Sequence, residues 1–128
     1  MDLGERTAAL KAILDAKPGA TTLARSPPRS TKGPLVLDYK VMGKTFAILQ
    51  VRGEALVILK CDPHLAEILR DQYTGVGRRT HLDPRHWICV WLEADVPTEE
   101  IERLAAQSYD LVCAGLTKKQ KAELGALG

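Results

Sequence analysis

The chain has 128 residues, enough for one domain built around one hydrophobic core. Hydrophobic residues make up 45% of it and charged residues 27%, a balance that excludes a globally disordered protein. The formal net charge of +2 is too small to indicate a partner, and no apolar run approaches the ~20 residues that a membrane-spanning helix needs.

The cysteines and the N-terminus indicate the compartment. Cys61, Cys89 and Cys113 are odd in number and lie far apart in apolar stretches, which is typical of buried, reduced thiols and not of a disulfide framework. The first residues contain no apolar segment of signal-peptide length. We therefore expect a cytoplasmic protein that does not enter a membrane.

The first third of the chain predicts a helix and a long loop. Leucine and isoleucine recur at helical spacing from Leu3 to Ala16, and Pro18-Gly19 ends that helix. Residues 18–34 mix proline, glycine, arginine, serine and threonine, which predicts a Pro/Arg-rich loop. Loops of this length in small domains are often functional or disordered.

Three strands are predicted next, over residues 35–42, 45–51 and 55–60, with turns at Gly43 and at Arg52-Gly53. This is the pattern of an antiparallel meander. Alternation along the second strand would place Phe46 and Ile48 on one face and Ala47 and Leu49 on the other.

Helices alternate with one more strand in the second half. Asp62 followed by Pro63 predicts a helix start, and that helix ends near Tyr73. A Gly- and Arg-rich loop over 74–85, a strand over 86–92 and a long helix from Pro97 or Thr98 follow. The order α, β-meander, α, β, α predicts an α+β fold in which helices pack on one antiparallel sheet, as a single domain over residues 1–128.

Four short motifs in this order resemble the MmcQ/YjbR family. They are Lys40-Val41-Met42-Gly43-Lys44-Thr45-Phe46-Ala47, Lys60-Cys61-Asp62-Pro63, His81-Leu82 with His86-Trp87, and Ser108-Tyr109-Asp110-Leu111-Val112 with Leu116. The resemblance covers roughly residues 40–121, and the region from Pro18 to Asp38 departs from the family pattern. It implies a CyaY-like α/β sandwich and a similarity to the "double wing" arrangement proposed to bind DNA. The function of the family is largely unassigned, and a fold alone does not supply one.

The residue types of a catalytic or metal site are present without the pattern that such a site needs. Cys61-x-x-His64 and His86-x-x-Cys89 have zinc-ligand types, but on a strand His86 and Cys89 point to opposite faces. Cys61 beside a helix start has no evident partner that would orient a base, and His81, Asp83 and His86 are more typical of loop residues that bond the backbone. We expect no catalytic residue, no metal, no cofactor and no enzyme activity.

Two tryptophans share one face of the last strand. Trp87 and Trp91 flank Cys89 at strand spacing, which favours a core or a sheet-helix interface and predicts a largely buried Trp87. The alternative is a partly exposed platform on which bases stack.

Positive charge gathers at turns and loops, which favours contacts with nucleic-acid phosphates over recognition of sequence. We predict a DNA-binding module whose phosphate contacts come from basic residues of these turns and loops: Lys44, Arg52, Arg78, Arg79, Arg25 and Arg29. The alternative is a protein- or small-ligand-binding adaptor that uses the acidic helix from Glu99 to Asp110, and an enzyme of unrecognised type is a third.

Overall fold

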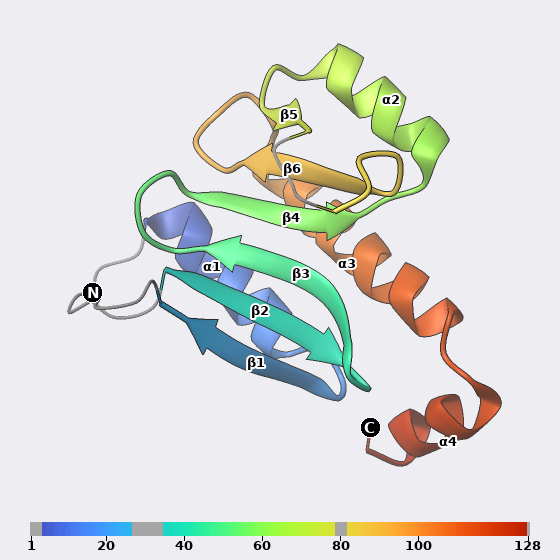
Figure 1. The fold of residues 1–128 in the computed structure, drawn as a ribbon. Helices are drawn as coiled ribbons and strands as arrows, with labels where there is room; N and C mark the ends of the chain where they lie inside the picture. Colours follow the sequence, from blue (N-terminus) through green and yellow to red (C-terminus); the bar gives the residue numbers. More distant parts are fainter. Residues whose placement is uncertain (1–3, 27–34, 79–81, 128) are drawn as a thin grey trace.

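The computed structural model describes residues 4–26, 35–78 and 82–127, which form one sheet and a set of helices (Figure 1). In chain order the elements are α1 (Glu5–Asp15), β1 (Ala20–Arg25), β2 (Val36–Val41), β3 (Lys44–Gln50), β4 (Leu56–Lys60), α2 (Pro63–Gln72), β5 (Val76–Gly77), β6 (Trp87–Trp91), α3 (Thr98–Ala114) and α4 (Lys118–Leu127). The predicted α+β class with an antiparallel sheet is confirmed.

The six strands lie in the order β1-β2-β3-β4-β6-β5, and every neighbouring pair is antiparallel. Strands β1 to β4 follow one another as a meander. Helix α2 then carries the chain past the position of β6 to the edge, so that β6 is inserted between β4 and the short strand β5. Helices α1 and α3 cross one face of the sheet, and none of the helices in the described ranges crosses the other face (Figure 1).

Local sequence signals fix several element boundaries. The Asp62 carboxylate accepts hydrogen bonds from the backbone N–H groups of His64 and Leu65 and so caps α2, as Asp62-Pro63 predicts. The four strands and the long helix predicted between residues 35 and 114 are confirmed to within one or two residues. None of the helices within the described ranges has the length and apolar content to cross a bilayer.

Strand β1 corrects the prediction of a loop over residues 18–34. Ala20–Arg25 pairs with β2 from Ala20 opposite Val41 to Arg25 opposite Val36. The loop prediction was wrong here because five of the six β1 side chains are exposed, so the strand lacks the apolar alternation that marks a half-buried strand. Residues 27–34 lie outside the described residues. The predicted loop over 74–85 likewise contains the two-residue strand β5.

The main core lies between the sheet and the helices. Leu10 and Leu14 of α1, Ala66 and Leu69 of α2, and Leu104, Ala105 and Val112 of α3 pack against alternate residues of β2, β3, β4 and β6. The tyrosines at the core's edge are satisfied by hydrogen bonds: the Tyr39 hydroxyl donates to the Asp15 carboxylate at 2.7 Å, and the Tyr109 hydroxyl donates to the Pro18 carbonyl. These polar ends tie α1 and α3 to the sheet.

A β-bulge overturns the predicted facing of Phe46. Tyr39 lies opposite Ala47, but the next pair is Lys40 opposite Thr45, so Phe46 is an extra residue on β3. Phe46 and Ala47 therefore both lie on the helix side, where the Phe46 ring meets the Tyr109 ring edge-on at 5.2 Å. Ile48 lies on the opposite face, so the prediction that Phe46 and Ile48 share a face was wrong.

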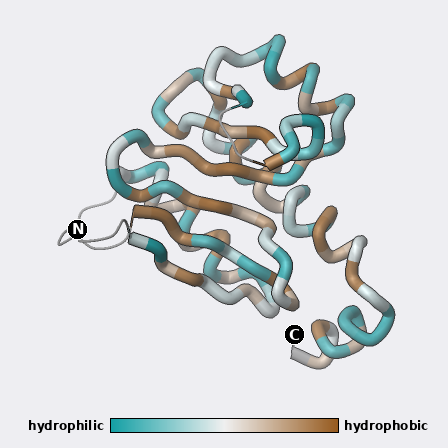
Figure 2. The backbone as a smooth tube through the Cα atoms, in the orientation of Figure 1, coloured by the Kyte–Doolittle hydropathy of each residue, from teal (hydrophilic) through white to brown (hydrophobic). Residues whose placement is uncertain are grey.

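The sheet face opposite α1 and α3, called here the open face, carries a second apolar cluster. Ile48, Leu56, Ile58 and Cys89 are buried there, and Trp87 and Trp91 are half-buried beside them. Figure 2 shows the hydrophobic colouring concentrated on the middle strands of the sheet. Trp87 is buried over most of its surface, as predicted, but it does not lie at a sheet-helix interface, because the described helices cover the other face of the sheet.

Candidate nucleic-acid interface

Two lysines stand at the same end of the open face. Lys40 follows Tyr39, and Lys60 follows Leu59; both preceding residues belong to the helix-side core, so alternation turns both lysines to the open face. Lys60 is paired across the strands with Trp87. Within the described part of the chain, neither ammonium group has a hydrogen bond or an ion pair. Both are therefore available to an anion.

Two arginines add charge beside Trp87. The Arg70 guanidinium reaches from α2 and donates to the carbonyls of Pro84 at 2.5 Å and Trp87 at 2.9 Å. Its Nε atom is buried and has no acceptor among the residues that the structure describes. Burial lowers the pKa of Arg70, and the nearby charge of Arg78 lowers that pKa further. Positive charge is thus concentrated where β5 ends and β6 begins.

Two acids near this end, Asp62 and Asp83, are engaged in local contacts. Asp62 caps α2, and the Asp83 carboxylate pairs with Arg85 at 3.4 Å. The backbone N–H of Arg85 and its side chain hold the pKa of Asp83 below its usual value. We call this end of the sheet the basic end: Lys40, Lys60 and Trp87 lie on the open face there, and Arg70 and Arg78 lie beside its edge.

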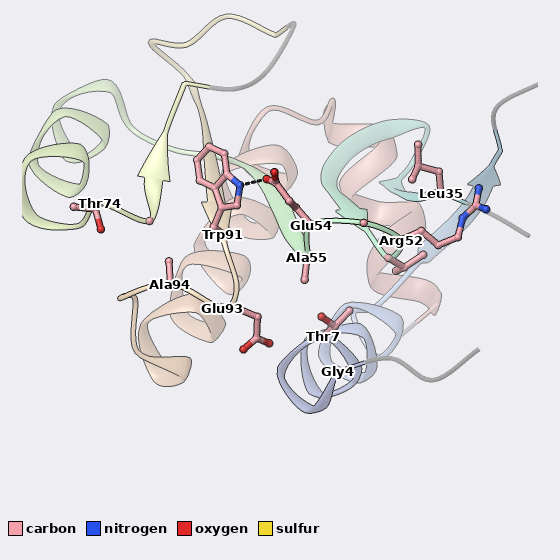
Figure 3. Close-up of a pocket in the computed structure, with 13 residues that line it drawn as sticks. Gly4, Thr7, Leu35, Arg52, Glu54, Ala55, Thr74, Trp91, Glu93 and Ala94 are labelled. Carbon is pink, nitrogen blue, oxygen red and sulfur yellow. Dashed lines mark hydrogen bonds between the residues drawn. The ribbon is translucent and has the colours of Figure 1, made fainter. Parts of the chain in front are cut away.

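The opposite end of the sheet has a different character. Trp91 Nε1 donates to Glu54 Oε2 at 2.6 Å, and both residues line a cavity of about 1200 Å³ together with Thr7, Arg52 and Glu93 (Figure 3). Figure 3 shows the Arg52 guanidinium turned toward Leu35 and away from Trp91. Two carboxylates, those of Glu54 and Glu93, therefore lie near the second tryptophan, at an end of the sheet that also holds Arg25 and Arg52.

The structure separates the basic residues named from the sequence. Lys44 and Arg78 lie at the basic end, although Lys44 turns to the helix side, where its ammonium group donates to the Gly115 carbonyl at the end of α3 at 3.2 Å. Arg25 and Arg52 lie at the other end: Arg25 forms an ion pair with Asp38, and Arg52 lines the cavity. Arg29 and Arg79 lie outside the described residues.

Three cations of the basic end were not singled out from the sequence. Lys40 and Lys60 each follow a buried strand residue, and the alternation of β2 and β4 could have placed them on the face opposite the core. Arg70 carried no such signal, because its contacts to Pro84 and Trp87 depend on the docking of α2 against β6.

The cysteines and histidines in the described ranges differ in their surroundings. His86 is exposed while Cys89 is fully buried. Burial, with the adjacent Asp62 charge, raises the pKa of the Cys61 thiol to about 11, opposite to what a nucleophilic thiolate needs. No cluster of three His, Cys, Asp or Glu side chains suited to a metal ion occurs among the residues placed by the structure.

The fold and the open face define a class: a small α+β sandwich with helices on one side of an antiparallel sheet. A protein-family model described as YjbR matches residues 15–111. The chain is 35% identical over 95 residues to the uncharacterised protein YjbR of Escherichia coli K12, covering 73% of this chain and 75% of that one. This protein belongs to the YjbR family.

A second relative and two solved structures are also similar. The uncharacterised protein YbdF of Escherichia coli O157:H7 is 28% identical over 90 residues, 70% of this chain and 74% of that one. Deinococcus radiodurans DR2400, described as a DUF419 domain, matches with a TM-score of 0.76 and 30% identity over 92% of this chain and 86% of that chain. A Pseudomonas syringae protein matches with a TM-score of 0.63 and 22% identity over 84% of this chain and 98% of that one, which shows the fold alone.

Proposed function

We propose that this protein is a non-enzymatic DNA-binding module that contacts phosphate groups with the cations of the basic end. The observation that carries the proposal is the pair Lys40 and Lys60 on the open face. Their strands are separated by one strand, so their backbones stand about 10 Å apart across the sheet. Two ammonium groups at that separation suit neighbouring positions along a phosphate backbone.

The surroundings of the two lysines support the same ligand. Arg70 and Arg78 raise the local positive potential, and the buried Asp38 is already paired with Arg25. Phosphate contacts give affinity without sequence readout, so binding should fall steeply with salt and depend little on sequence. The sequence predicts phosphate contacts from basic turn and loop residues; of these we keep Arg78, and we add Lys40 and Lys60 as main contacts.

The test is fluorescence anisotropy with labelled single- and double-stranded oligonucleotides at several salt concentrations. Replacing Lys40 and Lys60 together by alanine should weaken binding to all sequences about equally. Each lost contact should reduce the slope of log affinity against log salt by about 0.9 on duplex and about 0.7 on single strands. The free energy of unfolding should remain within roughly 0.5 kcal/mol of the parent for each change, because these side chains extend from the sheet surface.

Arg103→Ala is the matched control, since this exposed arginine lies on α3 and pairs with Glu100. It should leave both affinity and salt slope unchanged. Absence of binding at low salt and micromolar protein would end the nucleic-acid proposal. Binding that is insensitive to the lysine pair would place the interface elsewhere.

A groove beside α3 favours the second candidate function, a protein- or small-ligand-binding adaptor. A cavity of about 280 Å³ between α2 and α3 is lined by Leu65 and Leu111, with Asp62 and Asp110 at its rim. Leu111 is 38% exposed, so an apolar group flanked by a cation could dock there. Leu111→Asp should abolish binding to such a partner and leave oligonucleotide binding unchanged.

A further inference from the structure

Resting on the DNA-binding function, we propose that the ligand is a single strand of nucleic acid and that one of its bases stacks on the ring of Trp87. The inference comes from the position of this ring at the basic end, half-buried on the sheet face that the described helices leave uncovered. Single-strand binders combine cations that follow the backbone with aromatic rings on which bases stack. The basic end supplies both kinds of group within neighbouring strands.

The backbone of Trp87 is fixed on both sides. Its N–H donates to the Asp83 carbonyl at 3.0 Å, and its own carbonyl accepts from Arg70 at 2.9 Å. The side chain packs against the open-face cluster with Ile58 and Cys89. A ring held in this way loses little further freedom when a base stacks on it, which favours binding.

The neighbouring cations suit the phosphates on either side of a stacked base. Lys60 lies directly opposite Trp87 on β4, so the two Cβ atoms are about 5 Å apart. Lys40 stands two strands further along the same end. A strand that crosses the sheet from β6 toward β2 would therefore place its base on Trp87 and its following phosphates near Lys60 and Lys40.

A duplex cannot use this arrangement. Its base faces are covered by the neighbouring bases, and access to a face requires unstacking at a cost of a few kcal/mol. The open face is a broad sheet surface that none of the described helices crosses, so it offers no helix to enter a major groove. Only an unpaired base can lie flat against Trp87.

Trp91 is a control that the chain itself supplies. It lies on the same strand and face, about 13 Å from Trp87, and it is half-buried like Trp87. Its indole N–H is bonded to Glu54, its ring lies against Gly77, and Glu93 lines the same cavity. These carboxylates repel phosphate, so Trp91 should not take part in binding.

The two tryptophans of the chain can be followed separately by fluorescence. In Trp91→Phe the indole of Trp87 is the one that emits, and in Trp87→Phe that of Trp91. We titrate each with oligodeoxythymidylate of about 12 nucleotides, within the site sizes of single-strand binders. Emission from Trp87 should be quenched in step with binding measured by anisotropy, whereas emission from Trp91 should not change.

Affinity is measured on a second pair of variants. Trp87→Leu keeps an apolar side chain on the sheet and should lower single-strand affinity about 5- to 150-fold, the range for loss of one base stack. Trp91→Leu should change it less than about threefold. Parent protein should bind a duplex of the same length more weakly, and Trp87→Leu should leave that duplex affinity unchanged.

The outcomes separate the two proposals. Duplex binding as tight as single-strand binding, with no quenching of Trp87, overturns the single-strand inference and leaves the DNA-binding function standing. No binding of either oligonucleotide overturns both. If Trp87→Leu fails to fold, the quenching in Trp91→Phe still decides, because that variant retains Trp87.

Discussion

The thiol of Cys61 lies at the junction of β4 and α2, next to the cap residue Asp62. Its pKa of about 11 leaves almost no thiolate at neutral pH, because burial and the adjacent carboxylate both disfavour the charge. Cys89 is fully buried as well, while Cys113 on α3 is half-buried. The three cysteines should therefore differ sharply in reactivity.

We expect one thiol, that of Cys113, to react with a maleimide or disulfide reagent in the native protein near pH 8, and all three to react after unfolding. Time-resolved labelling with mass spectrometry checks the order. Cys113→Ser should remove the fast phase. A fast phase that is lost in Cys61→Ser instead would show an activated Cys61 thiolate and reopen the question of catalysis.

At the scale of elements, helix α3 holds together the two middle strands of the sheet. The Ser108 hydroxyl accepts from the Lys60 N–H at 2.8 Å and donates to the Phe46 carbonyl at 2.6 Å. Because Phe46 is displaced by the bulge, this hydroxyl bridges β3 and β4 where their direct pairing ends. The same bridge fixes the backbone of Lys60, one of the proposed phosphate contacts.

Ser108→Ala should lower the free energy of unfolding by about 1–3 kcal/mol, because it leaves a buried donor and a buried acceptor unpaired. Gln107→Ala, one position earlier and half-exposed, should cost less than about 0.5 kcal/mol. Urea denaturation of the three proteins measures both differences. Equal midpoints for Ser108→Ala and the parent would show that the bridge contributes nothing to stability.

At the scale of the whole molecule, the sequence predicted the elements that carry strong local signals. The amphipathic helix α3, the Asp62-Pro63 start of α2 and the middle strands all have a cap or a clear period, and their positions are confirmed. Strand β1 has neither, since it is an edge strand whose side chains are mostly exposed. The bulge at Phe46 depends on register between two strands, which alternation along one strand does not specify.

The candidate site was only partly predictable for the same reason. Alternation correctly put Trp87, Cys89 and Trp91 on one face, but which face the helices cover is a tertiary property. Lys40, Lys60, Arg70 and Trp87 come from three strands and a helix. Strand pairing and the docking of α2 bring them to the same end of the sheet, and no local motif encodes either of these. The distribution of charge along the sequence indicated turn and loop residues as the phosphate contacts, whereas the lysines of the open face lie at the ends of strands.

The most direct test of the interface is to map the binding of a short oligodeoxythymidylate on the backbone amide signals of isotope-labelled protein by NMR. We expect chemical-shift changes to concentrate on Lys40, Lys60, Arg78 and Trp87, and to be absent at Glu54, Glu93 and along the exposed side of α3. They should decrease together as salt is raised. Changes confined to α3 and the groove at Leu111, or no changes at millimolar oligonucleotide, would contradict a nucleic-acid interface on the open face.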